Sequence, residues 1–392
     1  MKLILTKWQQ NIGAFGFEDN QLVEANIFDE EQKICVGDIY LAKVHKILPN
    51  LNAYFLKLGR DEIFLPFQEA GREYKNGENI LVQIKKEASK GKQPLGTTNI
   101  SLAGVYCVVH YDLYSISAST KLNESDRAYW KDVLYQFLNS EDLSEEDRDL
   151  LKKYGVIVRT NVNECENASE LTSEWLDLAR RLDFIMEKGL YQSLYTKLHG
   201  EKQGYISHLK NVSFQNLEEI VTDDITVYEE LKNSFDGQQE VCSKIRYYED
   251  DFSLAKLYCI ESRLQEALNK KVWLKSGGFL LIEPTEALTV IDVNSGKCER
   301  KNTSEEYYKK INTEAAQMIA RQIKLRNISG IIIIDFINME LEENRKELLQ
   351  LLSSYVREDK VKTRVMGMTS LGLVEMTRKK IEKPLWEQIK QE

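Results

Sequence analysis

The sequence predicts a multidomain α/β protein with α+β parts, and three observations lead to this prediction. The chain has 392 residues, enough for two to four domains. Short strand-like segments with turn signals follow Gly37, which is typical of a small closed barrel. Two apolar runs, residues 288–295 and 330–336, each carry an aspartate and are separated by a helical pattern, which predicts a β-α-β unit.

The first part of the chain is expected to be rich in β-structure. Within residues 1–35, the polar pair Asp19-Asn20 separates two strand-like segments, which is typical of a hairpin. The barrel strands are expected at residues 38–47, 51–58, 62–65, 80–87 and 105–113.

Aromatic and basic side chains alternate on the expected barrel. The aromatic residues are Tyr54, Phe55 and Phe64, and the cations are Lys43, Lys46, Lys57 and Arg60. Such a mixture forms a stacking platform for single-stranded nucleic acid. The alternative, that these aromatic residues are barrel core, is equally compatible with the pattern.

The middle of the chain is expected to be mostly helical, over residues 125–155 and 166–198. One face of the second segment carries Leu171, Trp175, Leu178 and Leu182, which predicts a buried stripe. A strand is expected at residues 155–161. Arg159 and Thr160 in it could clasp a phosphate, and the alternative is a surface salt bridge.

The last part of the chain is expected to alternate strand and helix. Residues 204–270 do so first, followed by a strand at 279–283. A helix is expected from about residues 302–306 to Arg326, with Ile311, Ala315, Ile319 and Ile323 facing a sheet. The continuous β-branched runs around it predict strands buried on both faces.

The two aspartates predict a metal site. Asp292 and Asp335 lie towards the carboxyl ends of the expected parallel strands, where they would meet at one edge of the sheet. Mg²⁺ needs one or two carboxylates together with substrate phosphate. Asn294 points to the same side as Asp292, and Lys297, Arg300 and Lys301 follow it, suited to nearby phosphates. The alternative is that both acids cap neighbouring helices.

Charge and composition limit which ligands, cysteine chemistry and cellular location are expected for the protein. The net charge of −9 argues against general nucleic-acid binding, although residues 357–383 are basic, a run that is otherwise typical of a solvated helix face. The 6 cysteines include no CxxC pair, which favours reduced thiols over disulfides or a zinc site. No signal peptide or membrane span is apparent, so a cytoplasmic location is expected. The histidines show no metal-ligand spacing, and the Gly277-Gly278 turn is too weak a pattern for a phosphate loop.

Several segments resemble the ribonuclease E/ribonuclease G family of bacterial endoribonucleases. These segments occur in the family order over nearly the whole chain: residues 97–104, 158–160, 277–278, 286–295, 312–316, 319–322, 325–326, 330–337 and 372–379.

The resemblance implies a domain organisation. An RNase H-like scaffold (1–35 and 205–270) would be interrupted by an OB-fold RNA-binding barrel (36–118) and a 5′-phosphate sensor region (119–204). A deoxyribonuclease-I-like catalytic subdomain (271–392) would follow.

The resemblance also implies an activity, Mg²⁺-dependent hydrolysis of single-stranded RNA to 5′-phosphate and 3′-hydroxyl products. Asp292 and Asp335 would bind the metal, with Mn²⁺ as a possible substitute, and Asn294 would assist. Phe55 and Phe64 would contact RNA, with Lys43, Lys297 and Arg300 as further RNA-binding residues. Arg159 and Thr160 would bind a 5′-monophosphate.

Three departures from the family pattern modify these expectations. The CPxC zinc link of the family does not occur in the sequence, so no zinc and no zinc-linked assembly is expected, while a homodimer stays compatible. Tyr40-Leu41-Ala42-Lys43 is less basic than the usual segment, and acidic residues follow Arg159-Thr160 where the family has glycine.

These expectations give two hypotheses. The first is an endoribonuclease of RNA decay or ribosomal RNA processing, supported by the intact Asp292, Asn294 and Asp335. The second is a catalytically weak RNA-binding or ribosome-assembly factor on the same scaffold, suggested by the three departures.

Overall fold

The computed structural model describes residues 1–28, 34–88, 92–111, 114–165, 167–200, 204–212, 217–236, 238–296, 305–357, 359 and 361–389. The chain forms two compact units. Unit 1 comprises Met1–Ile27, Val221–Asp224 and Tyr247–Glu392, and unit 2 comprises Phe28–Ile220 and Ile225–Arg246. The finer division expected from the sequence, with RNase H-like and deoxyribonuclease-I-like parts, stays a prediction.

A closed OB-like barrel opens unit 2. Its strands follow the order β4-β5-β6-β8-β7, and β7 pairs back with β4 to close the ring; β13 adds to β4. The strands are β4 (Ile39–Leu48), β5 (Ala53–Leu58), β6 (Asp61–Pro66), β7 (Asn79–Lys86), β8 (Leu95–Thr97) and β13 (Lys197–His199). Alternate residues of these strands, among them Val44, Leu56 and Ile63, fill the interior. The predicted small closed barrel is therefore confirmed.

The strand expected at residues 105–113 does not belong to the barrel. It is β10 (Cys107–His110), which pairs with β9 (Ser101–Ala103) and β12 (Gly155–Val158), and β11 (Ile116–Ala118) pairs with β12. The expectation that it was a barrel strand is wrong, because strand spacing along the chain cannot reveal pairing with a strand about 50 residues later.

Unit 2 also contains six described α-helices, of which the first and the third contact this second sheet. They are α1 (Glu124–Leu138), α2 (Glu145–Leu151), α3 (Ala168–Lys188), α4 (Gly204–Lys210), α5 (Ile225–Ser234) and α6 (Gln239–Lys244). The predicted stripe on α3 is confirmed, since Leu171, Trp175, Leu178 and Leu182 are all buried. Asn123, Ser144 and Asn167 cap α1, α2 and α3 with side-chain oxygens, which is why these helices begin where they do.

Unit 1 begins with a meander that confirms the predicted hairpin. The strands β1 (Lys2–Trp8), β2 (Asn11–Glu18) and β3 (Gln21–Phe28) belong to a sheet of order β15-β14-β1-β2-β3. The strands β14 (Glu219–Thr222) and β15 (Ile245–Tyr247) complete this sheet. Their C-terminal residues, from Val221 in β14 and Tyr247 in β15, belong to unit 1. Asp19 and Asn20 adopt positive φ angles of 46° and 57°, as a tight hairpin turn requires. Helices α7 (Leu254–Leu257) and α8 (Ile260–Leu268) pack on this sheet.

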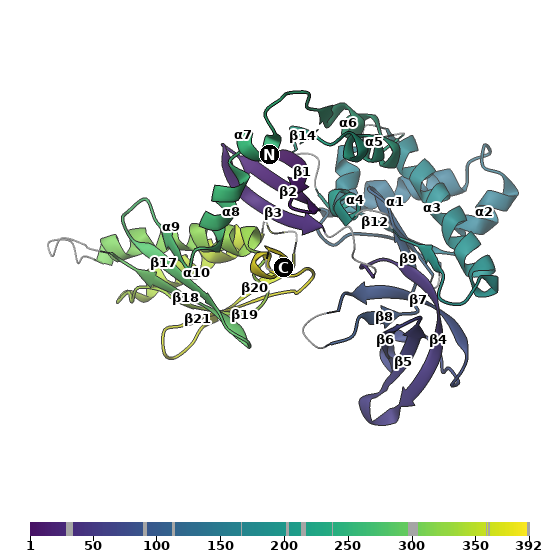
Figure 1. Ribbon diagram of the computed structural model, residues 1–392, viewed down its shortest axis with the longest axis horizontal. Helices are drawn as coiled ribbons and strands as arrows, with labels where there is room; N and C mark the ends of the chain where they lie inside the picture. The colour runs from purple at the N-terminus through teal and green to yellow at the C-terminus, as the bar shows by residue number, and fades with distance from the viewer. Residues whose placement is uncertain are drawn as a thin grey trace. The chain divides into compact units, whose positions relative to one another are not determined.

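The second sheet of unit 1 has the order β16-β17-β18-β19-β21-β20. Figure 1 labels β17, β18, β19, β20 and β21 of this sheet. Its strands are β16 (Lys271–Trp273), β17 (Phe279–Pro284), β18 (Leu288–Asn294), β19 (Gly330–Asp335), β20 (Thr363–Met368) and β21 (Val374–Arg378). The accompanying helices are α9 (Glu305–Leu325), α10 (Glu342–Arg357) and α11 (Leu385–Ile389). Only β18 and β19 pair in parallel, joined by α9, which confirms the predicted β-α-β unit. The expected helix start at residues 302–304 lies outside the described residues.

Helices cover one face of this sheet. Ile291, Val293, Ile332 and Ile334 pack with residues of α9 and α10, and the predicted helix face of Ile311, Ala315, Ile319 and Ile323 is buried there. On the opposite face, Val290 is 37% and Ile331 is 50% exposed. The prediction of strands buried on both faces is wrong, because a single layer of helices leaves every second residue of the strands on an open face.

Candidate active site

The two aspartates lie directly opposite each other on this open face. Asp292 of β18 pairs in register with Asp335, the last residue of β19. Paired residues project to the same side of a sheet, and neighbouring strands are about 4.8 Å apart. The two carboxylates therefore extend to the same side of the sheet from adjacent backbones.

The aspartates differ in exposure and in their hydrogen bonds. Asp292 is half-buried and accepts a hydrogen bond from Asn294 Nδ2 at 2.7 Å. Asp335 is exposed, and within the described residues it has neither a hydrogen-bond nor an ion-pair partner. Neither acid accepts a hydrogen bond from the start of a helix among the described residues, so a role as a cap does not account for them there.

This donor set suits a hard divalent cation. Mg²⁺ takes oxygen ligands, keeps several waters and is usually held by one or two carboxylates. No group of three or more His, Cys, Asp or Glu side chains that could hold a metal occurs in the part of the chain that the structure describes. Asp292 and Asp335 would therefore hold such an ion with water or substrate oxygens in the remaining positions.

A glycine turn fixes the backbone beside Asn294. A Cβ on Gly278 would lie 2.8 Å from Asn294 O, and one on Gly296 would lie 2.3 Å from Gly277 O. These contacts leave no room for a side chain. The backbone amides of Lys275 and Ser276 donate to the carboxylate of Glu314 on α9. The Gly277-Gly278 turn thus holds the end of β18 in place.

Two buried polar residues hold the neighbouring strands. Asn312 is fully buried on α9; its Nδ2 donates to Ile337 O at 2.7 Å and its Oδ1 accepts from Ile337 N at 3.1 Å. Arg378 of β21 is 5% exposed and pairs with Asp359 at 2.6 Å. Sequence reasoning assigned neither residue a role. Both lie in the segments that resemble the known family, which was the one available signal.

The predicted phosphate contacts around the aspartates are only partly described. Lys297, Arg300 and Lys301 lie outside the described residues. Within the basic region 357–383, Arg378 serves a buried ion pair, so the solvated helix face considered for this region does not apply to it.

The barrel brings most of its predicted RNA-binding residues together. Phe55 and Phe64 are cross-strand partners with ring centroids 5.6 Å apart, and both are half-buried on the outside of the barrel. Lys43 pairs with Lys57, two residues from Phe55, on the same outer side. Tyr54, in contrast, belongs to the barrel core. Of the two alternatives, the core interpretation therefore holds for Tyr54 alone.

Arg159 lies just beyond β12 and is bonded to the protein itself. Its Nη1 donates to Gly104 O, and its Nη2 donates to Asn211 Oδ1 at 2.6 Å. Burial lowers the pKa of the Arg159 guanidinium. Thr160, the next residue, is exposed. No carboxylate forms an ion pair with Arg159 within the described residues, so the surface salt bridge considered from the sequence is absent there.

Glu174 of α3 organises the backbone beside Arg159. It accepts hydrogen bonds from the amides of Val105, Tyr106 and Cys107 at 2.7, 2.7 and 2.9 Å. Burial raises the pKa of Glu174, although these hydrogen bonds oppose the effect. The carboxylate leaves space only for glycine at position 104, where a Cβ would lie 2.5 Å from Glu174 oxygens.

The sequence is similar to a family of known proteins and to several of its members. The model of the ribonuclease E/G family matches residues 101–381. Ribonuclease G of Escherichia coli strain K12 is 32% identical over 382 residues, covering 92% of this chain and 76% of that protein. Ribonuclease G of Haemophilus influenzae is 32% identical over 391 residues, covering 94% and 77%. Ribonuclease E of Synechocystis is 30% identical over 406 residues, covering 98% and 58%.

The chain belongs to the ribonuclease E/G family. This membership confirms the predicted family and the predicted class of enzyme, an endoribonuclease. The matched range includes Asp292, Asn294, Asp335, Arg159 and Thr160. It does not include the barrel residues Phe55, Phe64 and Lys43, so their roles depend on the resemblance over the longer alignments.

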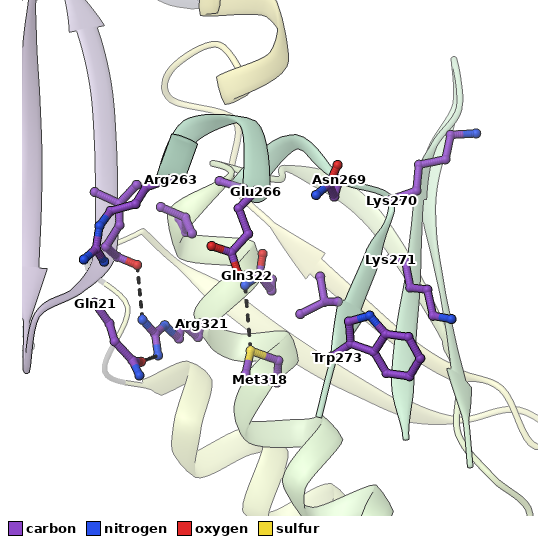
Figure 2. A pocket seen from close by; sticks show the side chains of 14 residues that line it. Gln21, Arg263, Glu266, Asn269, Lys270, Lys271, Trp273, Met318, Arg321 and Gln322 are labelled. Atoms are coloured by element: carbon purple, nitrogen blue, oxygen red, sulfur yellow. Dashed lines mark hydrogen bonds between the residues drawn. The ribbon is translucent and has the colours of Figure 1, made fainter. Parts of the chain in front are cut away.

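A groove of about 780 Å³ lies in unit 1 beside the edge strand β16 of this ribonuclease E/G family member (Figure 2). Its charged lining consists of Arg263, Lys270, Lys271 and Arg321 against Glu266. Arg321 donates to Gln21 Oε1 and to Leu22 O, and burial lowers the pKa of its guanidinium. Cations therefore outnumber acids near one edge of the sheet that carries the aspartates.

None of the described helices has the length and apolar character of a membrane span.

Proposed function

We propose that this endoribonuclease hydrolyses single-stranded RNA with Mg²⁺ held by Asp292 and Asp335, and leaves a 5′-phosphate and a 3′-hydroxyl. The observation that carries the proposal is the register pairing of these two acids on an open sheet face. A carboxylate pair that protein donors leave almost unbonded has the capacity for an external cation. RNA decay or ribosomal RNA processing in the cytoplasm is the proposed setting, with RNA as the partner.

The reaction assigns a part to each residue of the site. A bound Mg²⁺ would supply Lewis acidity and lower the pKa of a coordinated water. Water oxygen attacks phosphorus, the bond from phosphorus to O3′ breaks, and the leaving O3′ takes up a proton. Asn294 donates to Asp292 through Nδ2, and its Oδ1 would accept a hydrogen bond from the attacking water.

The remaining predicted residues would bind the rest of the RNA. Phe55 and Phe64 offer ring faces for base stacking beside Lys43. Arg159 and Thr160 are proposed to bind a 5′-monophosphate, and Lys297 and Arg300 to contact phosphates close to the cleavage site.

Substitution of Asp292 tests the proposal. Asp292→Asn should abolish cleavage of a 5′-monophosphorylated oligonucleotide while RNA binding and the free energy of unfolding change little. Glu283→Gln is the matched control, because Glu283 is an exposed acid on the neighbouring strand β17 and should leave the rate unchanged. Unchanged cleavage by Asp292→Asn, or cleavage in excess EDTA, would overturn the proposal.

One observation favours the second candidate function, a catalytically weak RNA-binding or ribosome-assembly factor. Both terminal nitrogens of Arg159 are already bonded to Gly104 and Asn211, which reduces its capacity for a phosphate. The same assay separates the candidates, since salt-sensitive RNA binding without products would support the second.

A further inference from the structure

A cluster of one cation and two aromatic rings lies on the same open face as the aspartates. We call Lys271, Trp273 and Phe279 the β16–β17 cluster. Trp273 pairs with Phe279, and Phe279 pairs with Asn294. Lys271 pairs with Leu281, which pairs with Asp292. Because paired residues project to the same side of a sheet, the cluster and the acids share one surface.

The geometry of the cluster is that of a cation between two ring faces. Lys271 Nζ lies 3.8 Å from the centroid of Trp273 and 3.8 Å from that of Phe279. The two rings meet edge to face at 64°, with centroids 5.5 Å apart. Figure 2 shows Lys271 and Trp273 extending from β16 at one end of the groove. The ammonium group thus covers one face of the indole, and Trp273 nevertheless remains an exposed residue.

The fold does not explain why a large aromatic residue stands here. Trp273 is 62% exposed, whereas its neighbours Val272 and Leu274 turn to the other face and pack with the helix-covered core. Lys270 forms an ion pair with Glu283 at 3.2 Å, but Lys271 has no carboxylate partner within the described residues. The cluster therefore presents to solvent a cation without a carboxylate partner in the described residues, together with exposed indole surface.

We propose that Trp273 stacks against a base next to the scissile phosphate and that Lys271 neutralises an adjacent phosphate, so that the β16–β17 cluster positions single-stranded RNA. This inference rests on the proposed function of Asp292 and Asp335. Trp273 is two strands away from Asn294, roughly 10 Å at ordinary strand spacing. A nucleotide adjoining the one at the aspartates can place its base there. Exposed rings beside cations are the recurrent means of binding unpaired bases.

The test measures base stacking without cleavage. In the Asp292→Asn background, 2-aminopurine is placed in turn at each position of a short single-stranded oligonucleotide. We expect fluorescence quenching by stacking at one or two positions beside the cleavage site. Trp273→Ala should remove the quenching at those positions and raise Kd about tenfold, Trp273→Phe should restore most of it, and Phe252→Ala, at an exposed aromatic residue elsewhere in unit 1, should change neither.

A second measurement uses the active protein. With an abasic nucleotide at the quenched position, wild type should show an increase in KM similar to that caused by Trp273→Ala, and combining both changes should add little. Unaltered binding and quenching in Trp273→Ala would overturn the inference and leave the surface for a protein partner. Equal losses at all positions would also overturn it. If the active chain fails to cleave but the quenching pattern holds, the proposed catalysis fails and the stacking role stands.

Discussion

The acids on the β18–β19 face and the arginine beyond β12 differ in how far the protein itself satisfies their charge. Asp335 has no bonding partner in the part of the chain that the structure describes, and Asp292 accepts one hydrogen bond from Asn294. Arg159 is half-buried and donates to Gly104 and Asn211. The acids thus keep their capacity for an external ligand, whereas Arg159 contributes to the fold before it can bind anything else.

This difference shows which part of the proposed function has the stronger structural support. Two carboxylates placed directly opposite each other repel, so they destabilise the sheet unless a cation joins them. A half-buried arginine with two protein acceptors needs no external ligand to satisfy it. The proposed metal site therefore draws support from the arrangement of the two acids, while the proposed 5′-phosphate site depends more on the resemblance to the family.

The largest expected effect is at the unsatisfied acid. Asp335→Asn should lower the cleavage rate about 10³-fold or more, because the proposed metal would supply several kcal/mol of transition-state stabilisation. It should also abolish the rise in Tm that Mg²⁺ produces in wild type. Thermal unfolding with and without Mg²⁺ measures the second effect. A Mg²⁺ shift that persists in Asp335→Asn would mean that the ion binds elsewhere.

The next largest expected effect is a loss of stability when Glu174, which binds the backbone beside Arg159, is replaced. Glu174→Ala should destabilise unit 2 by more than about 3 kcal/mol, because three backbone amides lose their buried acceptor. Urea unfolding measures the loss. Glu187→Ala is the control on the same helix, since its pairing with Lys153 at 3.3 Å is exposed. Equal stability of the two variants would contradict the role assigned to Glu174.

A smaller effect separates the two roles of Arg159. Arg159→Ala should cost about 1–3 kcal/mol, since Gly104 and Asn211 each lose a donor. If the side chain also binds a terminal phosphate, the preference for 5′-monophosphate over 5′-hydroxyl substrates should disappear. Asn211→Ala removes one protein partner and should keep that preference. Cleavage of both substrates by both variants measures it, and an equal loss on both substrates in Arg159→Ala would leave it a structural residue only.

The smallest expected effect is on the pH dependence of stability, at Glu305, a carboxylate that already accepts hydrogen bonds from the protein. Glu305 accepts from Asn344 Nδ2 and from the amides of Glu340 and Leu341, and these hydrogen bonds hold the pKa of Glu305 below its ordinary value of 4.5. Because the folded-state pKa is lowered, its stabilising contribution is complete above pH 4.5 and is lost as the pH falls through the folded value. Glu305→Gln should thus reduce the free energy of unfolding near neutral pH. In strong acid the two proteins should converge, and a constant difference would contradict the assignment.

Sequence reasoning succeeded where the pattern is local. The turn at Asp19-Asn20, the buried stripe around Trp175 and the β-α-β unit follow from residue spacing alone. It failed at β10, which pairs with a strand far along the chain. It also failed on the second face of β18 and β19, because no local pattern reports how many layers of helices will cover a sheet.

The candidate site also contains features that local sequence patterns predicted and features that they could not predict. The positions of Asp292 and Asp335 at the ends of apolar runs were readable from the sequence, and so was the side to which Asn294 points. The bonds from Arg159 to Gly104 and Asn211 join residues 55 and 52 positions apart, so no spacing rule could predict them. The β16–β17 cluster depends on cross-strand register, which a single sequence does not fix.

The strands β18 and β19 are the sole parallel pair of the second sheet in unit 1. The proposed activity depends on the register of this pair, because the register places Asp292 opposite Asp335. Side chains alternate along a strand, so a slip of β19 by one residue would turn Asp335 towards α9 and bring an apolar neighbour to the surface. The helices could still form, and the overall secondary structure would hardly change. An insertion of one residue between Leu325 and Gly330 could therefore yield a folded but inert protein.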